Sequence, residues 1–104
     1  MIDIKPSHFA LVKQILKQYI PQCEVRVFGS RYKLNAKPHS DLDLVLIGDA
    51  KLDKIIVSRL KEAFAESDLP FRVDVLDWNA ISNEFRQIIE QGYEIIQQKS
   101  LFVK

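Results

Sequence analysis

The chain has 104 residues, of which 47% are hydrophobic and 28% are charged, so it is long enough for one domain with a buried core. Its formal net charge of +1 argues against a protein that binds nucleic acid through bulk positive charge. The apolar run at residues 44–47 is far too short to cross a membrane, no secretory signal is visible, and the single cysteine, Cys23, excludes an internal disulfide. We therefore expect one domain over residues 1–104 in the cytoplasm, with no membrane association and no direct nucleic-acid binding.

The first half of the chain predicts a helix followed by two strands. Hydrophobic residues recur at helical spacing over residues 7–20, with Ser7 as the expected N-cap. Residues 24–28 are short and rich in β-branched side chains, which is typical of a strand. Residues 42–47 are apolar on both faces except at Asp43 and predict a buried strand. Since the connection between these strands is too short for a helical crossover, we expect them to be neighbours joined by a functional loop.

The second half predicts two further helices, each followed by a strand. The expected elements are a helix over residues 52–66, a strand over 71–76, a helix over 80–91 and a short strand over 93–97. Gly92 suits the left-handed position that follows a helix. Helices that alternate with strands indicate an α/β fold, with a small mixed sheet flanked by helices and covered mainly on one side.

Gly29 and Ser30 stand at the exit of the first strand. Glycine lets a backbone turn sharply and approach a ligand closely. A serine hydroxyl and the backbone amides that follow it can hold a phosphate oxygen. Arg31 comes next and could also reach a phosphate. A glycine–serine pair by itself is more often a plain turn.

Two carboxylates, Asp41 and Asp43, stand at the start of the second strand. Positions two apart in a strand face the same side, so these side chains project together from Cα atoms about 6–7 Å apart. Like charges about 4 Å apart repel by roughly 4 kcal/mol at an effective dielectric constant of 20. A raised pKa, a basic partner or a divalent cation would relieve this repulsion, and Mg²⁺ binds carboxylate and phosphate oxygens together. The alternative is that the pair caps the strand at its solvent edge.

A third carboxylate, Asp74, lies between Val73 and Val75 in the third predicted strand. If this strand lies beside the second, Asp74 comes close to the other two carboxylates. Asp77 points to the opposite face and is the weaker candidate. The alternative is that the face carrying Asp74 is simply exposed to solvent, as one face of an antiparallel sheet can be.

These motifs together resemble the signature of the minimal nucleotidyltransferases of the DNA polymerase β-like superfamily. The run GSRYKLNAKPHSDLDLVLIG matches the pattern of Gly-Ser, about ten residues, then Ser-Asp-x-Asp and a hydrophobic residue, with a third Asp on a later strand. The similarity extends from about residue 25 to residue 96. It departs at residues 32–35, where many members of the superfamily carry a glycine.

The resemblance implies the nucleotidyltransferase fold and a site for two Mg²⁺ ions and a nucleoside triphosphate. It assigns metal binding and catalysis to three carboxylates, Asp41, Asp43 and Asp74, the last also acting as base. It assigns phosphate binding to Gly29 and Ser30, and we add Arg31 and Ser40 as further candidates. His39, next to Ser40, is a weaker candidate, since most loop histidines are merely solvated.

A freestanding domain of this length is similar to the MntA-type antitoxins, which work with a separate HEPN-domain ribonuclease. This resemblance implies transfer of AMP from ATP to a tyrosine of the HEPN toxin. Two alternatives stay open. The chain could be a binding-only antitoxin that blocks its partner by contact, or it could transfer a nucleotide to a small molecule.

Overall fold

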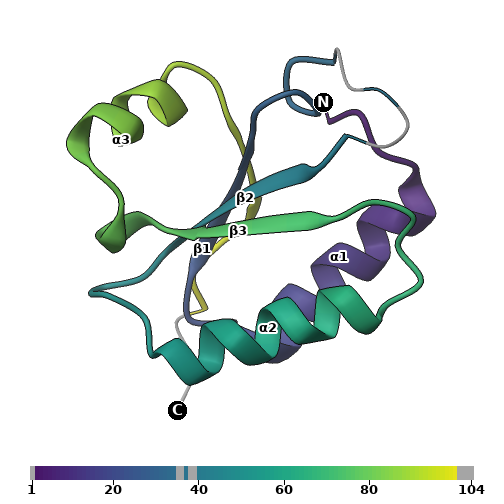
Figure 1. The fold of residues 1–104 in the computed structure, drawn as a ribbon, viewed down its shortest axis with the longest axis horizontal. Helices are drawn as coiled ribbons and strands as arrows, with labels where there is room; N and C mark the ends of the chain where they lie inside the picture. The colour runs from purple at the N-terminus through teal and green to yellow at the C-terminus, as the bar shows by residue number, and fades with distance from the viewer. Residues whose placement is uncertain (1, 35–36, 38–39, 101–104) are drawn as a thin grey trace.

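The computed structural model describes residues 2–34, 37 and 40–100. Helices and strands alternate along the chain (Figure 1) in the order α1 (Pro6–Tyr19), β1 (Glu24–Phe28), β2 (Leu42–Ile47), α2 (Lys54–Glu66), β3 (Val73–Asp77), the 3₁₀ turn η1 (Trp78–Ala80), α3 (Asn83–Glu90) and β4 (Glu94–Gln97). The strands form one sheet in the order β3-β2-β1-β4. β1 pairs antiparallel with β2 and β4, while β2 pairs parallel with β3, which confirms the expected mixed sheet.

Helices α1 and α2 cover one face of the sheet, and α3 lies on the other side (Figure 1). Alternate strand residues, including Val25, Val27, Leu42 and Leu44, are almost fully buried in the core between the sheet and the two long helices. The opposite face is only partly covered. It carries Asp43 and Asp74, and Phe28, the partner of Asp43 on β1, contacts Phe85 of α3 with ring centres 6.0 Å apart.

The central strands follow the sequence closely, whereas helix ends differ from the expected ones. β1 and β2 have the predicted bounds and are adjacent, as expected from their short connection. Ser7 is not an N-cap, because α1 begins at Pro6, whose fixed φ suits the first helical turn. α2 begins later than predicted, at Lys54. Asp53 precedes it as the N-cap and accepts a 2.7 Å hydrogen bond from the amide of Ile55.

The last helix is shorter than predicted, and Gly92 has another role than the expected one. Ser82 caps α3 at its start, and the separate turn η1 precedes it. The φ of Gly92 is not in the left-handed region. A Cβ atom at Gly92 would lie 2.7 Å from Cε2 of Tyr32, so glycine here makes room for an aromatic ring. In the described residues, no helix is both long and apolar enough to span a membrane.

Candidate active site

The parallel pairing of β2 and β3 brings two carboxylates together. Asp43 is the direct partner of Asp74 in the register of these strands. Paired residues of adjacent strands project to the same face from backbones about 4.8 Å apart. Their neighbours Leu44 and Val75 point into the core and are 0% and 4% exposed. The third strand lies beside the second, so the condition on which the approach of Asp74 to Asp43 depended is met.

The position of Asp43 makes its negative charge unfavourable. Burial raises the pKa of Asp43 above its ordinary value, and the nearby charges of Asp74 and Asp41 raise it further. Three carboxylates therefore influence one another at this end of the sheet. A bound cation would relieve both the repulsion and the loss of hydration.

Asp41 has a basic partner that the sequence analysis did not identify. Nη2 of Arg72 donates a 2.9 Å hydrogen bond to Oδ2 of Asp41. The Arg72 side chain is 80% exposed, so this ion pair contributes little to stability. A sequence signal existed, because Arg72 stands two residues before Asp74 and therefore projects to the same face of the strand.

The carboxylates are suitable ligands for Mg²⁺ but are not arranged as a finished metal site. Within residues 2–34, 37 and 40–100, no group of three or more acidic, histidine or cysteine side chains is placed to hold an ion. Oδ2 of Asp41 accepts the hydrogen bond from Arg72. The donor chemistry fits, since hard cations prefer carboxylate oxygens and Arg72 balances only one of the three negative charges.

The loop after β1 lies directly against this cluster. Gly29 has a φ of +78°, in the region that favours glycine. Its carbonyl accepts a 3.0 Å hydrogen bond from the amide of Lys33, which closes a tight turn. A Cβ atom at Gly29 would collide with the carboxylate of Asp43. The absence of a side chain therefore lets the loop approach the acidic cluster.

Leu34 ends the same turn, in the segment where many members of the family carry a glycine. Leu34 has a φ of +61° and is 56% exposed. A non-glycine residue in this region costs roughly 1–2 kcal/mol. The loop therefore adopts at Leu34 a conformation that glycine would adopt without strain.

Arg31 connects three parts of the site. Its side chain is buried, and Nε and Nη2 donate hydrogen bonds of 3.1 Å and 2.8 Å to the carbonyl of Ser40. Nη1 donates a 2.9 Å bond to the carbonyl of Asp3, whose amide donates to the Arg31 carbonyl at 2.8 Å. The guanidinium also lies 4.3 Å from the ring centre of Phe71. Arg31 thus ties the segments before β2 and β3 to the N-terminal segment.

The remaining candidates occupy different parts of the loop. The guanidinium of Arg31 is directed at backbone carbonyls, so its expected phosphate contact stays a prediction, and its geometry favours a positioning role. Ser40 accepts a 2.8 Å hydrogen bond from the amide of Lys37 through Oγ. Ser30 lies in the turn after Gly29 and is partly exposed. His39 lies outside the described residues.

Asp77 has a structural role in the described residues. Its Oδ2 accepts a 2.8 Å hydrogen bond from the amide of Leu52, and its Oδ1 accepts one of 2.9 Å from the amide of Asn79. These bonds fix the start of η1 and the loop before α2. The prediction that Asp77 points away from Asp74 agrees with these contacts.

Comparison with known proteins identifies the family. Residues 11–101 match the family described as polymerase beta, nucleotidyltransferase. The chain belongs to this nucleotidyltransferase family. It is also 52% identical over 103 residues to the probable protein adenylyltransferase MntA of Haemophilus influenzae, and the match spans 99% of this chain and 90% of that protein.

Solved structures share the nucleotidyltransferase fold. A toxin–antitoxin structure with AMP-PNP matches with a TM-score of 0.74 and 22% identity, over 89% of this chain and 74% of the other. A tri-AMPylated Shewanella oneidensis HEPN toxin in complex with an MNT antitoxin matches with a TM-score of 0.67 and 22% identity, over 88% and 71% of the two chains. At this identity the matches establish the fold alone.

Proposed function

We propose that this chain is a Mg²⁺-dependent protein adenylyltransferase, an antitoxin that transfers AMP from ATP to a tyrosine of a HEPN-domain toxin. The observation that carries the proposal is the parallel register that sets Asp43 beside Asp74 on the face where the Gly29 loop approaches. The relative MntA, at 52% identity, supports protein as the acceptor. The proposal places residues 1–104 as one domain in the cytoplasm, where ATP is available.

The proposed reaction is an in-line displacement at the α-phosphorus of ATP. The tyrosine oxygen forms a bond to this phosphorus, the bond to the bridging oxygen of the β-phosphate breaks, and pyrophosphate leaves. Asp74 takes the phenolic proton. Gly29 and Ser30 hold the β- and γ-phosphate oxygens through the turn that follows β1. Asp41, Asp43 and Asp74 would hold two Mg²⁺ ions, which neutralise the charge that develops on the attacking and leaving oxygens.

One observation favours a second candidate, the binding-only antitoxin. Asp41 is paired with Arg72, so the carboxylates are not assembled as a metal site. An antitoxin that acts by contact alone would tolerate this arrangement. Transfer to a small molecule ranks third, because no observation on the described residues favours it.

The test is an incubation of the purified chain with ATP, MgCl₂ and its HEPN partner. Intact-protein mass spectrometry should show one or more added AMP groups on the partner, and tandem spectra should place them on tyrosine. The double variant Asp41→Asn/Asp43→Asn should add none, while Asp49→Asn, which changes an exposed carboxylate paired with Lys99, should match the original protein. A partner that stays unmodified in the complete reaction would contradict the proposal. Toxin neutralisation that survives the double variant unchanged would support contact alone.

A further inference from the structure

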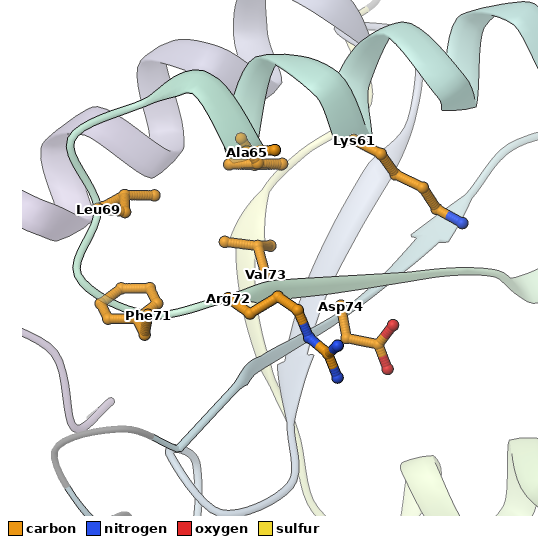
Figure 2. Close-up of a pocket in the computed structure, with 8 residues that line it drawn as sticks. Lys61, Ala65, Leu69, Phe71, Arg72, Val73 and Asp74 are labelled. Atoms are coloured by element: carbon orange, nitrogen blue, oxygen red, sulfur yellow. The ribbon is translucent and has the colours of Figure 1, made fainter.

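A groove runs along the outer side of β3, next to Asp74 (Figure 2). It includes a cavity of about 530 Å³ between α2 and β3. Its apolar wall is formed by Phe64, Leu69 and Val73, and its polar rim by Lys61, Arg72 and Asp74. A second cavity of about 450 Å³ shares Lys61 and continues to Asp77 at the far end of the strand. We call the two together the β3-edge groove.

The strand that borders this groove has an open edge. β3 is the terminal strand of the sheet formed by the described residues and pairs there only with β2. The amide of Leu42 donates to the carbonyl of Arg72 at 2.9 Å, so the backbone groups of Arg72, Asp74 and Leu76 are the ones that face β2. By the same alternation, the N–H and C=O groups of Val73 and Val75 point outward. An extended peptide can add to such an edge as a further strand.

Strand alternation also fixes where the side chains of an added strand would point. In Figure 2, the side chain of Val73 is directed toward α2, whereas those of Arg72 and Asp74 are directed away from it. A residue of the added strand paired with Asp74 would project onto the same face as Asp74, about 4.8 Å along the sheet. Its two neighbours would enter the apolar wall of the groove. The groove can therefore present a hydroxyl residue to the carboxylates while it binds the residues on either side.

The charges of the groove favour an acidic peptide. Lys51, Lys54 and Lys61 line the two cavities, against Asp74 and Asp77. Arg72 also lines the first cavity, but its charge is paired with Asp41. The carboxylate of Asp77 already accepts two backbone hydrogen bonds. The groove thus carries a small excess of positive charge, which lies in the second cavity, where all three lysines are found.

We infer that the β3-edge groove binds the acceptor segment of the protein substrate as an added β-strand. The segment is extended, carries apolar residues next to the hydroxyl residue, and has Asp or Glu farther along. This inference rests on the proposed function for the identity of the acceptor. The new element is the docking mode. Main-chain hydrogen bonds to Val73 and Val75 would fix how the added strand is aligned with β3, and this alignment would place the hydroxyl beside Asp74.

Amide exchange measured by NMR tests the docking mode directly. In the complex with the HEPN partner, the outward amides of Val73 and Val75 should exchange at least about tenfold more slowly than in the free chain. The amides of Asp74 and Leu76 already face β2 and provide the internal control. A complex that transfers AMP while the outward amides exchange at unchanged rates would overturn the inference.

Substitutions in the groove give a second, kinetic test. Val73→Pro removes one outward N–H at the first residue of an edge strand, where proline is tolerated, and Val73→Ala keeps that N–H as the matched control. The proline variant should raise the KM for the partner by about tenfold more than the alanine variant, with the KM for ATP within about twofold of the original. The double variant Lys54→Glu/Lys61→Glu should also raise the KM for the partner, whereas Lys17→Glu on α1 should leave this KM unchanged. Equal KM values for the partner in the proline and alanine variants would count against strand addition.

The two proposals fail in distinguishable ways. If the original chain transfers no AMP but the partner slows amide exchange at Val73 and Val75, the docking inference is supported and the proposed reaction is contradicted. If a single-stranded RNA oligonucleotide protects these amides and the partner does not, the groove is a nucleic-acid site and the docking inference falls.

Discussion

The backbone of Gly29 lies against the carboxylate of Asp43. A Cβ atom at Gly29 would come within 3.2 Å of the carboxyl carbon of Asp43, and closer still to its Oδ2. Phe28, the residue before Gly29, pairs with Asp43 across β1 and β2. Because of this contact, the loop assigned to phosphates and the carboxylates assigned to metals form one unit, and a change in either should affect both.

Replacing Gly29 tests that unit. Gly29→Ala must accept a positive φ and displace the Asp43 side chain, so we expect a loss of about 1–2 kcal/mol in the free energy of unfolding and at least about tenfold in kcat/KM for transfer. The control is Gly48→Ala, where the nearest atom to a new Cβ is the end of the Leu52 side chain at 3.1 Å. Urea unfolding and transfer assays on both variants measure the difference. Equal behaviour of the two variants would refute the expectation.

Asp43→Asn should remove catalysis and spare the fold. The amide keeps the shape of the side chain but cannot supply a negative oxygen to a cation, so transfer should fall by at least about 100-fold. In the absence of metal, the variant should melt at a higher temperature than the original chain, because it removes repulsion with Asp74 and Asp41. Added MgCl₂ should stabilise the original chain more than the variant in thermal-shift measurements. A variant that retains full transfer would exclude Asp43 as a metal ligand.

The raised pKa of Asp43 predicts a pH dependence of stability in the metal-free chain. Burial and the charges of Asp74 and Asp41 raise this pKa above its ordinary value of 3.8. At a pH between the pKa of Asp43 in the unfolded chain and its higher pKa in the folded chain, the folded state binds a proton that the unfolded state has released. The contribution of Asp43 to the free energy of unfolding is therefore greatest below this window and falls as the pH rises through it.

Urea unfolding with a chelator, between about pH 4 and pH 7, measures this effect as the difference between the original chain and Asp43→Asn. The original chain should lose stability relative to the variant as the pH increases. A difference that does not change with pH would show that the carboxyl of Asp43 titrates normally.

Arg31 should act through the position of Ser40 and Asp41. Lysine keeps the charge but cannot donate the paired hydrogen bonds to the Ser40 carbonyl, so Arg31→Lys should weaken the apparent Mg²⁺ affinity and lower kcat by about tenfold. If Arg31 touches no phosphate, the substitution should change the KM for ATP by a smaller factor than it changes the apparent Mg²⁺ affinity. Arg59→Lys, on the exposed side of α2, is the control. A variant altered only in its KM for ATP would indicate phosphate contact instead.

Cys23 should be unreactive in the folded chain. Its side chain is fully buried, and burial, assisted by Asp77 and Asp49, raises its pKa to about 11. Little thiolate exists at pH 8, so a disulfide reagent should react only as fast as the chain unfolds. The rate should increase with urea in step with unfolding. Rapid reaction without urea would contradict the burial of this thiol.

Local patterns in the sequence determined most of the fold. The alternation of hydrophobic residues set β1 and β2 with their observed bounds, and the short connection made them neighbours. The valines beside Asp74 place it on the outer face, because strand side chains alternate. The same rule predicts that Asp41 and Asp43 share a face, but β2 begins only at Leu42, and Asp41 is paired with Arg72. The helix ends were less well defined. α2 and α3 begin after residues whose side chains cap them, Asp53 and Ser82, whereas α1 begins at Pro6 without a side-chain cap.

The tertiary structure alone decided which distant residues meet. The pairing of Asp43 with Asp74 depends on a parallel register across α2, which no local pattern specifies. The contact of Arg31 with Ser40 and Asp3, the pairing of Arg72 with Asp41, and the space that Gly92 leaves for Tyr32 all join segments far apart in the chain. Such contacts depend on how helices and strands pack in three dimensions, because a side chain finds its partners only once the backbone around it has been placed.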